Sequence, residues 1–378
     1  MTGRYSTRVE VPYVLSDPNT ASGLSLAETT AAQTLKTVGY ATMCVGKWHL
    51  GRLPQYMPNH RGFDQFFGIP YSSDMQPLMV LQNDQVVDNA PALNMLVQRF
   101  TAQAVATIQN QPQDAPFFLY VPYSSPHIPL LPSAGFRGAS QQGTYADLVM
   151  EMDWGIGQVL QTLANKGMDQ NTLVMFSSDH GPWYQGSAGR LRGRKAEVWE
   201  GGFRTPFLAR WPGTIPGGAV CTAMATAMGL LPTMAGLAGA LLPDNPLDGV
   251  DIWPLLSGQQ TTMNRDTFLY FDGWNLQCAR WGRWKLHVAR NNTTPWSPTP
   301  VVGAMNLPLA APELYDVEMD ACESSDCAAD HPDVVAQIRS RIDQVLPSFP
   351  AEVQNAWSAT MSHGVGYSPA GAMPVIQP

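Results

Sequence analysis

Two apolar runs, each followed directly by polar and titratable residues, constrain the fold of this chain more than any other feature. The runs cover residues 116–121 and 171–178, and a helical apolar stripe over residues 145–167 lies between them. Strands that are buried on both faces of a parallel sheet appear in sequence as continuous apolar runs. The order of run, helix and run therefore predicts an α/β fold with a parallel sheet. Ligands bind at the carboxyl edge of such a sheet, where Ser125-Pro126-His127 and Asp179-His180-Gly181 follow the two runs.

The remaining elements divide the chain into a large domain, a small one and a tail. In the large domain we expect helices at 26–38, 94–109 and 222–240, and strands at 41–45 and 207–213. After about residue 265 the pattern changes to short strands at 267–271, 276–280, 284–288 and 313–317, then a helix at 333–345. We predict a large domain over 1–262, an antiparallel-sheet subdomain over 263–350 and a loosely structured tail over 351–378, with a loop at 291–312.

Composition excludes several classes of protein. The chain has 378 residues, more than one hydrophobic core usually supports, and its 44% hydrophobic and 14% charged residues are typical of a globular protein. The formal net charge of −8 argues against a nucleic-acid partner. Residues 222–242 are apolar, but Pro232 and three glycines interrupt them, which favours buried helices over a membrane span. No signal peptide is visible, and Cys322 and Cys327 are the only closely spaced pair among five cysteines.

The strand at 41–45 ends in a glycine turn that presents Lys47 and His49. Side chains two residues apart share a face of an extended backbone, so the two groups can converge while Trp48 points away. A cation beside a group that titrates near neutrality suits an anionic ester substrate. Taken alone, these two residues fit a solvated lysine and an ordinary surface histidine better than a functional site.

Residues 39–51 have the pattern G-Y-x-T-x-x-V-G-K-W-H-L-G, and residues 61–68 read R-G-F-D-Q-F-F-G. Further on, the chain has P-F-F-L-Y from residue 116 with a P-H pair ending at His127, D-H-G-P from residue 179, and L-R-G-R-K with W-E-G-G-F-R-T-P between residues 191 and 206. Together these motifs resemble the sulfatase family of the alkaline phosphatase superfamily, arylsulfatase A most of all. The resemblance implies a three-layer α/β/α sandwich with a small C-terminal α+β subdomain.

The resemblance also implies roles for individual residues. Lys47 and Lys195 neutralise charge on the sulfuryl oxygens, and Ser72 lines the pocket around the nucleophile. His127 contacts the sulfate and assists the leaving group as a general acid, and His49 removes a proton from the covalent intermediate. Four cations within six residues usually form a solvated face. Apart from Lys195, we therefore expect structural or rim roles for these cations, which are Arg190, Arg192 and Arg194.

The resemblance implies that Asp179 and His180 are metal ligands. A carboxylate and an adjacent imidazole at a strand end can bind a divalent cation, but D-H-G alone would fit an ordinary polar turn. Many sulfatases have an asparagine where His180 stands. The family expectation is calcium, but an imidazole also suits manganese or zinc. The family's nucleophile is a formylglycine made from the cysteine of a C-x-P-S-R motif, and its metal site includes an Asp-Asp pair. Neither motif occurs in this sequence, which begins on a methionine of the M-T-G-R-Y segment that follows that cysteine in sulfatases. We therefore expect an N-terminally truncated sulfatase.

Three functions follow from these expectations. The first is a sulfuric ester hydrolase of arylsulfatase type, with a small-molecule or glycan sulfate ester as substrate and a formylglycine-generating enzyme as partner of a full-length form. The second is a phosphodiesterase or phosphonate monoester hydrolase, which His180 favours. The third is a truncated, non-catalytic protein that binds anions. The family is typically periplasmic, secreted or lysosomal.

Overall fold

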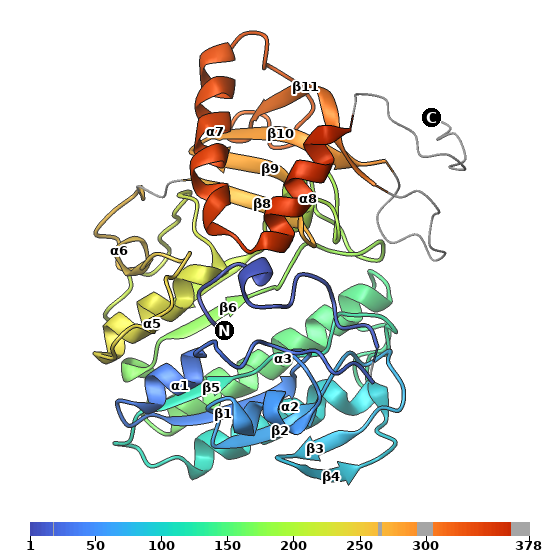
Figure 1. Cartoon of the computed structure of the whole chain (residues 1–378). Coiled ribbons are helices and arrows are strands. Elements are labelled where there is room, and N and C mark those ends of the chain that lie inside the picture. Colours follow the sequence, from blue (N-terminus) through green and yellow to red (C-terminus); the bar gives the residue numbers. More distant parts are fainter. Residues whose placement is uncertain (18, 264–266, 293–304, 364–378) are drawn as a thin grey trace. The chain divides into compact units, whose positions relative to one another are not determined.

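The computed structural model describes residues 1–17, 19–263, 267–292 and 305–363 (Figure 1). Its residues pack into two compact units. The first unit contains the described residues of 1–175 and 209–262, and the second contains those of 176–208 and those after 262. These units reflect packing within the chain. The domains expected from the sequence, 1–262 and 263–350, stay a prediction.

The first unit is organised around a five-stranded mixed sheet with the strand order β4-β3-β2-β1-β5. Its strands are β1 (Ala41–Lys47), β2 (Gln65–Ile69), β3 (Val80–Gln82), β4 (Gln85–Asp88) and β5 (Phe117–Tyr120). β1 runs parallel to both β2 and β5, whereas β3 pairs with β2 and β4 in antiparallel fashion. The parallel core places the carboxyl ends of β2, β1 and β5 side by side at one edge.

Helices cover both faces of this sheet. The helices of the first unit are α1 (Ala31–Lys36), α2 (Leu96–Asn110), α3 (Thr144–Asn165), α5 (Leu230–Ala238) and α6 (Trp253–Leu256). Ala32 of α1 packs with Cys44 of β1 on one face, while Phe100 of α2 packs with Val45 on the other. Successive strand residues point to opposite faces, so β1 contributes to both layers. The predicted α/β/α sandwich is confirmed.

The helices differ from expectation mainly at their ends. α1 begins at Ala31, not near residue 26, because Thr30 and Gln33 form a capping box at that point, and Leu26 is exposed. α5 begins at Leu230, so the helix expected from residue 222 is eight residues shorter at its start, and Gly239 ends it in the left-handed conformation. Val149 of the apolar stripe on α3 is exposed and does not belong to the core. No helix among the described residues has the length and apolar character to cross a membrane.

The two apolar runs form strands, but neither is buried on both faces in the described structure. β5 lies at the edge of its sheet and its side chains are half-buried. β6 (Val174–Ser177) pairs with β7 (Phe207–Arg210) in a two-stranded sheet, and Ser177 is exposed. An edge strand has a neighbour on one side, which leaves more of its surface uncovered.

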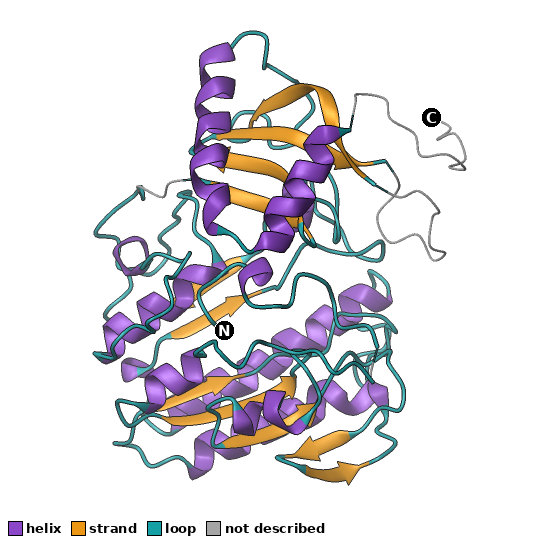
Figure 2. Ribbon diagram, viewed as in Figure 1, coloured by secondary structure: helices purple, strands orange, loops and turns teal. Residues whose placement is uncertain are grey.

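The second unit contains a four-stranded antiparallel sheet with the order β11-β10-β9-β8 (Figure 2). Its strands are β8 (Phe268–Asp272), β9 (Asn275–Trp281), β10 (Trp284–Asn291) and β11 (Asn306–Asp316), and its helices are α4 (Glu200–Phe203), α7 (Pro332–Val345) and α8 (Ala351–Ser362). This confirms the small C-terminal α+β subdomain. β11 starts at Asn306, so the loop expected over 291–312 is wrong for residues 306–312, and residues 293–304 lie outside the described residues.

The expected loose tail is wrong for residues 351–362, which form α8. Val353 of this helix is fully buried, and the Thr360 hydroxyl accepts a hydrogen bond from the Asn306 side chain at 3.1 Å. Tertiary contacts with β9 and β11 therefore stabilise a helix that the sequence interpretation did not recognise.

Candidate active site

The first unit brings Lys47, His49, Ser72 and His127 together where β1, β2 and β5 end. We call these residues, with Asp74, the first half-site. Lys47 is the last residue of β1 and stands opposite Ile69, the last residue of β2. Its amide donates to the Pro122 carbonyl beyond β5 at 2.7 Å, and its Nζ donates to the Ser72 hydroxyl at 3.4 Å. A cation and a hydroxyl thus lie side by side at the edge where ligands bind in α/β folds.

His49 sits two residues beyond Lys47 in a left-handed conformation, with φ of 59°. Its Nε2 atom lies 3.0 Å from the Leu15 carbonyl. Burial lowers the pKa of His49, and the charge of Lys47 lowers it further, while the Leu15 carbonyl and Asp74 act in the opposite direction. Trp48 is buried on the other side, where its ring packs edge-on against Phe63. The left-handed backbone at His49 departs from the extended conformation assumed for an i, i+2 pair, so the convergence of the Lys47 and His49 side chains stays a prediction.

His127 follows β5, and its Nδ1 donates to the Ile128 carbonyl at 2.7 Å. A carboxylate oxygen of Asp74 lies 3.9 Å from the same nitrogen. Burial raises the pKa of Asp74, but the Ser72 hydroxyl and the charges of His127 and Lys47 outweigh that effect, so the pKa is lowered. Asp74 is therefore an ionised partner of the cations in this half-site.

Sequence reasoning did not assign Asp74 a role. The signal was available, because Asp74 lies two residues after Ser72 in the segment that follows β2.

The second unit brings Asp179, His180 and Lys195 together, and we call these residues the second half-site. Asp179 and His180 follow β6, with 3.2 Å between an Asp179 oxygen and Nε2 of His180, whose Nδ1 donates to the Gly181 carbonyl at 2.8 Å. The amide of Lys195 donates to the Pro182 carbonyl at 3.0 Å, which holds the lysine backbone beside this turn. A Cβ atom at position 181 would lie 1.7 Å from the Gly201 carbonyl, so the close approach requires glycine.

The arginines near Lys195 have packing roles. The Arg192 guanidinium stacks 3.7 Å from the Trp199 ring centroid and donates to the Glu323 carbonyl at 2.8 Å. Arg194 lies 4.2 Å from the centroid of the Tyr184 ring. These contacts support the structural role expected for both arginines.

Asp179 and His180 supply two donors of the kinds that divalent metals accept. Asp179 is largely exposed and points one carboxylate oxygen toward His180, so the pair fits one side of a metal shell. Among the described residues there is no group of three or more His, Cys, Asp or Glu side chains arranged to hold a metal. The pair alone does not complete a shell, and we derive no catalytic step through a metal.

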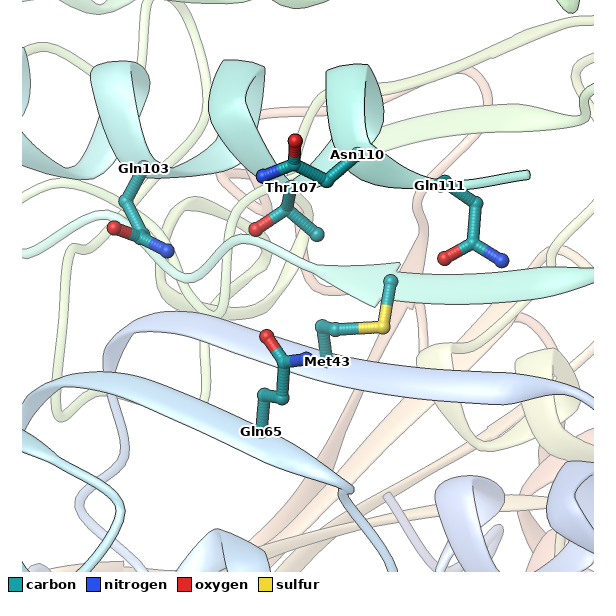
Figure 3. Close-up of a pocket in the computed structure, with 6 residues that line it drawn as sticks. All are labelled: Met43, Gln65, Gln103, Thr107, Asn110 and Gln111. Carbon is teal, nitrogen blue, oxygen red and sulfur yellow. The ribbon is translucent and has the colours of Figure 1, made fainter. Parts of the chain in front are cut away.

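A cavity of 130 Å³ lies at the other end of β1, and Figure 3 shows its lining. The six lining side chains are Met43, Gln65, Gln103, Thr107, Asn110 and Gln111. Gln65 is the first residue of β2, so the cavity lies at the amino ends of the parallel strands, away from Lys47. All six side chains are uncharged, and the cavity lacks the cations that an anionic ester requires.

Comparison with known proteins identifies the family. The sulfatase family model matches residues 1–240, and a model for the C-terminal region of aryl-sulfatase matches residues 263–365. Bovine arylsulfatase A is 33% identical over 417 aligned residues, covering all of this chain and 81% of its own length. Mouse N-acetylgalactosamine-6-sulfatase is 34% identical, covering 76% of this chain and 59% of its own length.

Solved structures agree in fold. The crystal structure of a sulfatase from Pseudoalteromonas sp. superposes with a TM-score of 0.82 at 23% identity, covering 97% of this chain and 80% of that one. At this identity the likeness shows the fold alone. The family models and the arylsulfatase A relative carry the assignment, and this chain belongs to the sulfatase family, whose members hydrolyse sulfuric esters.

Proposed function

We propose that this sulfatase acts on a sulfate monoester and that Lys47, Ser72 and His127 of the first half-site bind its sulfate group. Lys195 is proposed as a sulfate ligand from its place in the family motif alone. The observation that carries the proposal is the meeting of a lysine, a hydroxyl and an imidazole at the carboxyl ends of three neighbouring strands, with Lys47 and Ser72 3.4 Å apart. Fixed donors of this kind stabilise charge on transferring oxygens.

The two histidines take different roles in this proposal. His49 acts as a base, and its lowered pKa supports that role because the ring is then neutral at neutral pH. His127 protonates the leaving oxygen. Its Nδ1 donates to the Ile128 carbonyl and lies 3.9 Å from an Asp74 carboxylate oxygen, so Nε2 is the nitrogen proposed for this transfer.

Asp179 and His180 are the proposed metal ligands of this chain, and the metal would polarise the sulfate. Calcium is the expected ion, and His180 makes manganese or zinc the alternatives. Titration calorimetry with each metal tests this assignment. Asp179→Asn should weaken binding of the preferred ion by about tenfold or more, and equal binding by the variant would contradict the assignment.

The family's formylglycine is not assigned to any of the five cysteines, because none lies in a C-x-P-S-R motif. Its formation by a formylglycine-generating enzyme belongs to the proposal only for a chain that contains that motif. The two alternatives, a phosphonate or phosphodiester hydrolase and a non-catalytic anion-binding protein, are not favoured by the family models and relatives. Parallel assays on an aryl sulfate and an aryl phosphonate monoester distinguish the three functions. A sulfatase hydrolyses the sulfate preferentially, a phosphonate hydrolase the phosphonate, and a non-catalytic protein neither.

The substrate class is proposed only as far as a small-molecule or glycan sulfate ester. The relatives' names include an arylsulfatase and an N-acetylgalactosamine-6-sulfatase, which differ in the alcohol they release. A periplasmic, secreted or lysosomal location would suit such substrates.

Isothermal titration calorimetry tests the site directly: it measures the binding of sulfate and of an aryl sulfate to the 378-residue chain with calcium present. Lys47→Ala and Lys195→Ala should each weaken binding by about tenfold or more, equivalent to about 1.4 kcal/mol. Lys36→Ala is the matched control, because Lys36 is exposed and pairs with Asp64 away from Ser72. If the Lys47 and Lys195 variants bind as tightly as the control, the proposed site is wrong.

A further inference from the structure

The second unit contains four buried titratable residues that the proposed mechanism does not use. They are Glu200, Lys285, His287 and Glu323, and we call them the buried charge cluster. Lys285, His287 and Glu323 have no exposed surface, and Glu200 is 2% exposed. Lysine and glutamate are almost never fully buried unless they are paired, so the contacts of this cluster need an account.

Every polar group at the centre of the cluster has a partner. Lys285 donates to Glu323 at 2.9 Å, to Glu200 at 3.1 Å and to the Val198 carbonyl at 2.7 Å, which uses all three of its protons. The same Glu323 oxygen lies 3.0 Å from Nε2 of His287. The second Glu323 oxygen accepts the Glu200 amide at 2.6 Å.

The Glu200 carboxylate is equally satisfied. It accepts the Tyr270 hydroxyl at 3.0 Å on one oxygen and Arg280 at 3.1 Å on the other. Since no side-chain nitrogen or oxygen of these four residues lacks a hydrogen-bond partner, the cluster is a structural junction and not a ligand site.

The junction joins two distant parts of the chain. Lys285 and His287 lie on β10, Tyr270 on β8 and Arg280 on β9, so one side belongs to the C-terminal sheet. The other side is the segment 192–202, which is held through the Val198 carbonyl, the Glu200 amide and the Arg192 guanidinium. β10 thus holds the Val198 carbonyl, while Glu323, in the segment between β11 and α7, holds the Glu200 amide and the Arg192 side chain.

Backbone contacts extend this hold to the second half-site. Gly201 donates to the Arg192 carbonyl at 2.7 Å, closing the loop that carries Lys195. Gly181, next to His180, donates to the Gly202 carbonyl at 2.8 Å. A Cβ atom at position 202 would lie 2.1 Å from the Glu197 carbonyl, so this loop packs too tightly to shift without breaking these contacts.

We propose that Lys285 and Glu323 are positioning residues of the sulfatase site: Lys285 from β10 and Glu323 from the segment between β11 and α7 fix the loop that carries Lys195 against the Asp179–His180 turn. The consequence for sulfate binding rests on the proposed function. The charges of the cluster balance, since Lys285 and Arg280 oppose Glu200 and Glu323 while burial keeps His287 neutral. Removing one partner leaves a buried charge without its counterpart, whereas removing both is far better tolerated.

Three full-chain variants test the proposal by hydrogen exchange with mass spectrometry: Lys285→Met, Glu323→Gln and the double variant. In each, the Lys195 and Gly181 amides should exchange at least tenfold faster, while amides that pair β9 with β10 keep their protection. The double variant should recover thermal stability relative to the single variants and still exchange rapidly at Lys195, because methionine cannot bind the Val198 carbonyl. If Lys285 and Glu323 only stabilised the unit, the double variant would recover thermal stability and slow exchange at Lys195 together.

Ile338→Ala is the matched control. Ile338 is fully buried on α7, which packs on β9 and β10, so its truncation should destabilise the same unit without touching the cluster. Equal acceleration at Lys195 in this control and in the cluster variants would overturn the proposal, and so would unchanged exchange in the double variant. Sulfate affinity gives a second measurement, with an expected loss of about tenfold in the double variant. If Lys195→Ala does not weaken sulfate binding, the proposed function fails, and the exchange data still decide the positioning role.

Discussion

The Nζ atom of Lys47 lies 3.4 Å from the hydroxyl oxygen of Ser72, although 25 positions separate the two residues in the chain. Parallel pairing of β1 with β2 causes this proximity, because it brings Lys47 level with Ile69 and lets the next turn deliver Ser72. Asp74 joins the same group through the Ser72 hydroxyl. The first half-site is thus a product of strand register.

Gly46→Ala should disturb the close approach of β1 to the segment that follows β5. Gly46 has φ of 141°, and a Cβ atom there would lie 2.0 Å from the Pro122 carbonyl oxygen. The same oxygen accepts the hydrogen bond from the Lys47 amide. We expect a loss of about 2 kcal/mol in unfolding free energy, measured by urea denaturation.

Gly157→Ala is the control for that variant. Gly157 is an exposed position in α3 where an added Cβ meets nothing within 4 Å, so alanine should stabilise the protein by about 0.5–1 kcal/mol. A Gly46→Ala protein as stable as the wild type would contradict the tight approach at this edge.

Asp74→Asn should lower the pKa of His49 further. The Asp74 charge favours the protonated ring, and its removal leaves burial and the Lys47 charge, which both favour the neutral ring. An NMR titration of the histidine side chains measures the change. Asp84→Asn serves as the control, since Asp84 pairs with exposed His60. A rise in the pKa of His49 on losing Asp74 would refute the coupling.

Folding stability should fall on acidification because of His287. Burial lowers its pKa from 6.5 to about 4, with Glu323 acting in the opposite direction and Lys285 and Arg290 reinforcing the decrease. The unfolded chain takes up the proton first, so this contribution is complete above pH 6.5 and is lost as pH falls from 6.5 toward about 4. The full effect is about 3 kcal/mol.

Urea denaturation at pH 7 and pH 5 measures this dependence and stays above the range in which Glu323, whose pKa is lowered from 4.5, contributes. His287→Gln should flatten the dependence, whereas His60→Gln, at a largely exposed site, should not change it. If the unfolding free energy of His287→Gln depends on pH as steeply as that of the wild type, other groups cause the dependence.

The cysteines should react in two classes. Sγ of Cys278 lies 3.1 Å from Nδ1 of His287, which in turn contacts Glu323, an arrangement that resembles an activated thiol. Cys278 is nevertheless fully buried, and burial raises its pKa, as it does for Cys44.

Iodoacetamide labelling of the folded protein, followed by peptide mass spectrometry, measures this difference. Cys221 and Cys322 are exposed and should react first, with Cys44 and Cys278 at least about tenfold slower. Labelling in urea is the control, in which all should react alike. Rapid labelling of Cys278 in the folded protein would show that the cluster opens.

Local sequence predicted β1, β5 to β10 and most helices, and the family motifs supplied the candidate site residues, whereas β2, β3, β4 and the role of Asp74 were not predicted. Alternation, apolar runs and glycine stops depend on neighbours within a few positions, so β1, α2 and α7 could be predicted closely. The boundary of α1 was less predictable, because its capping box competes with an apolar pattern that continues upstream. α8 was missed because its stability depends on contacts with β9 and β11.

Only the tertiary structure decided the environment of β10. In sequence its residues alternate, with Lys285 and His287 on one face and Leu286 and Val288 on the other, a pattern typical of a strand with one solvated face. In the fold, both Lys285 and His287 are fully buried. Val198 and Glu200, more than 80 positions away in the chain, contact Lys285, and Trp199 and Glu323 contact His287. Periodicity reports which residues share a face, but whether another segment covers that face depends on contacts that no local pattern encodes.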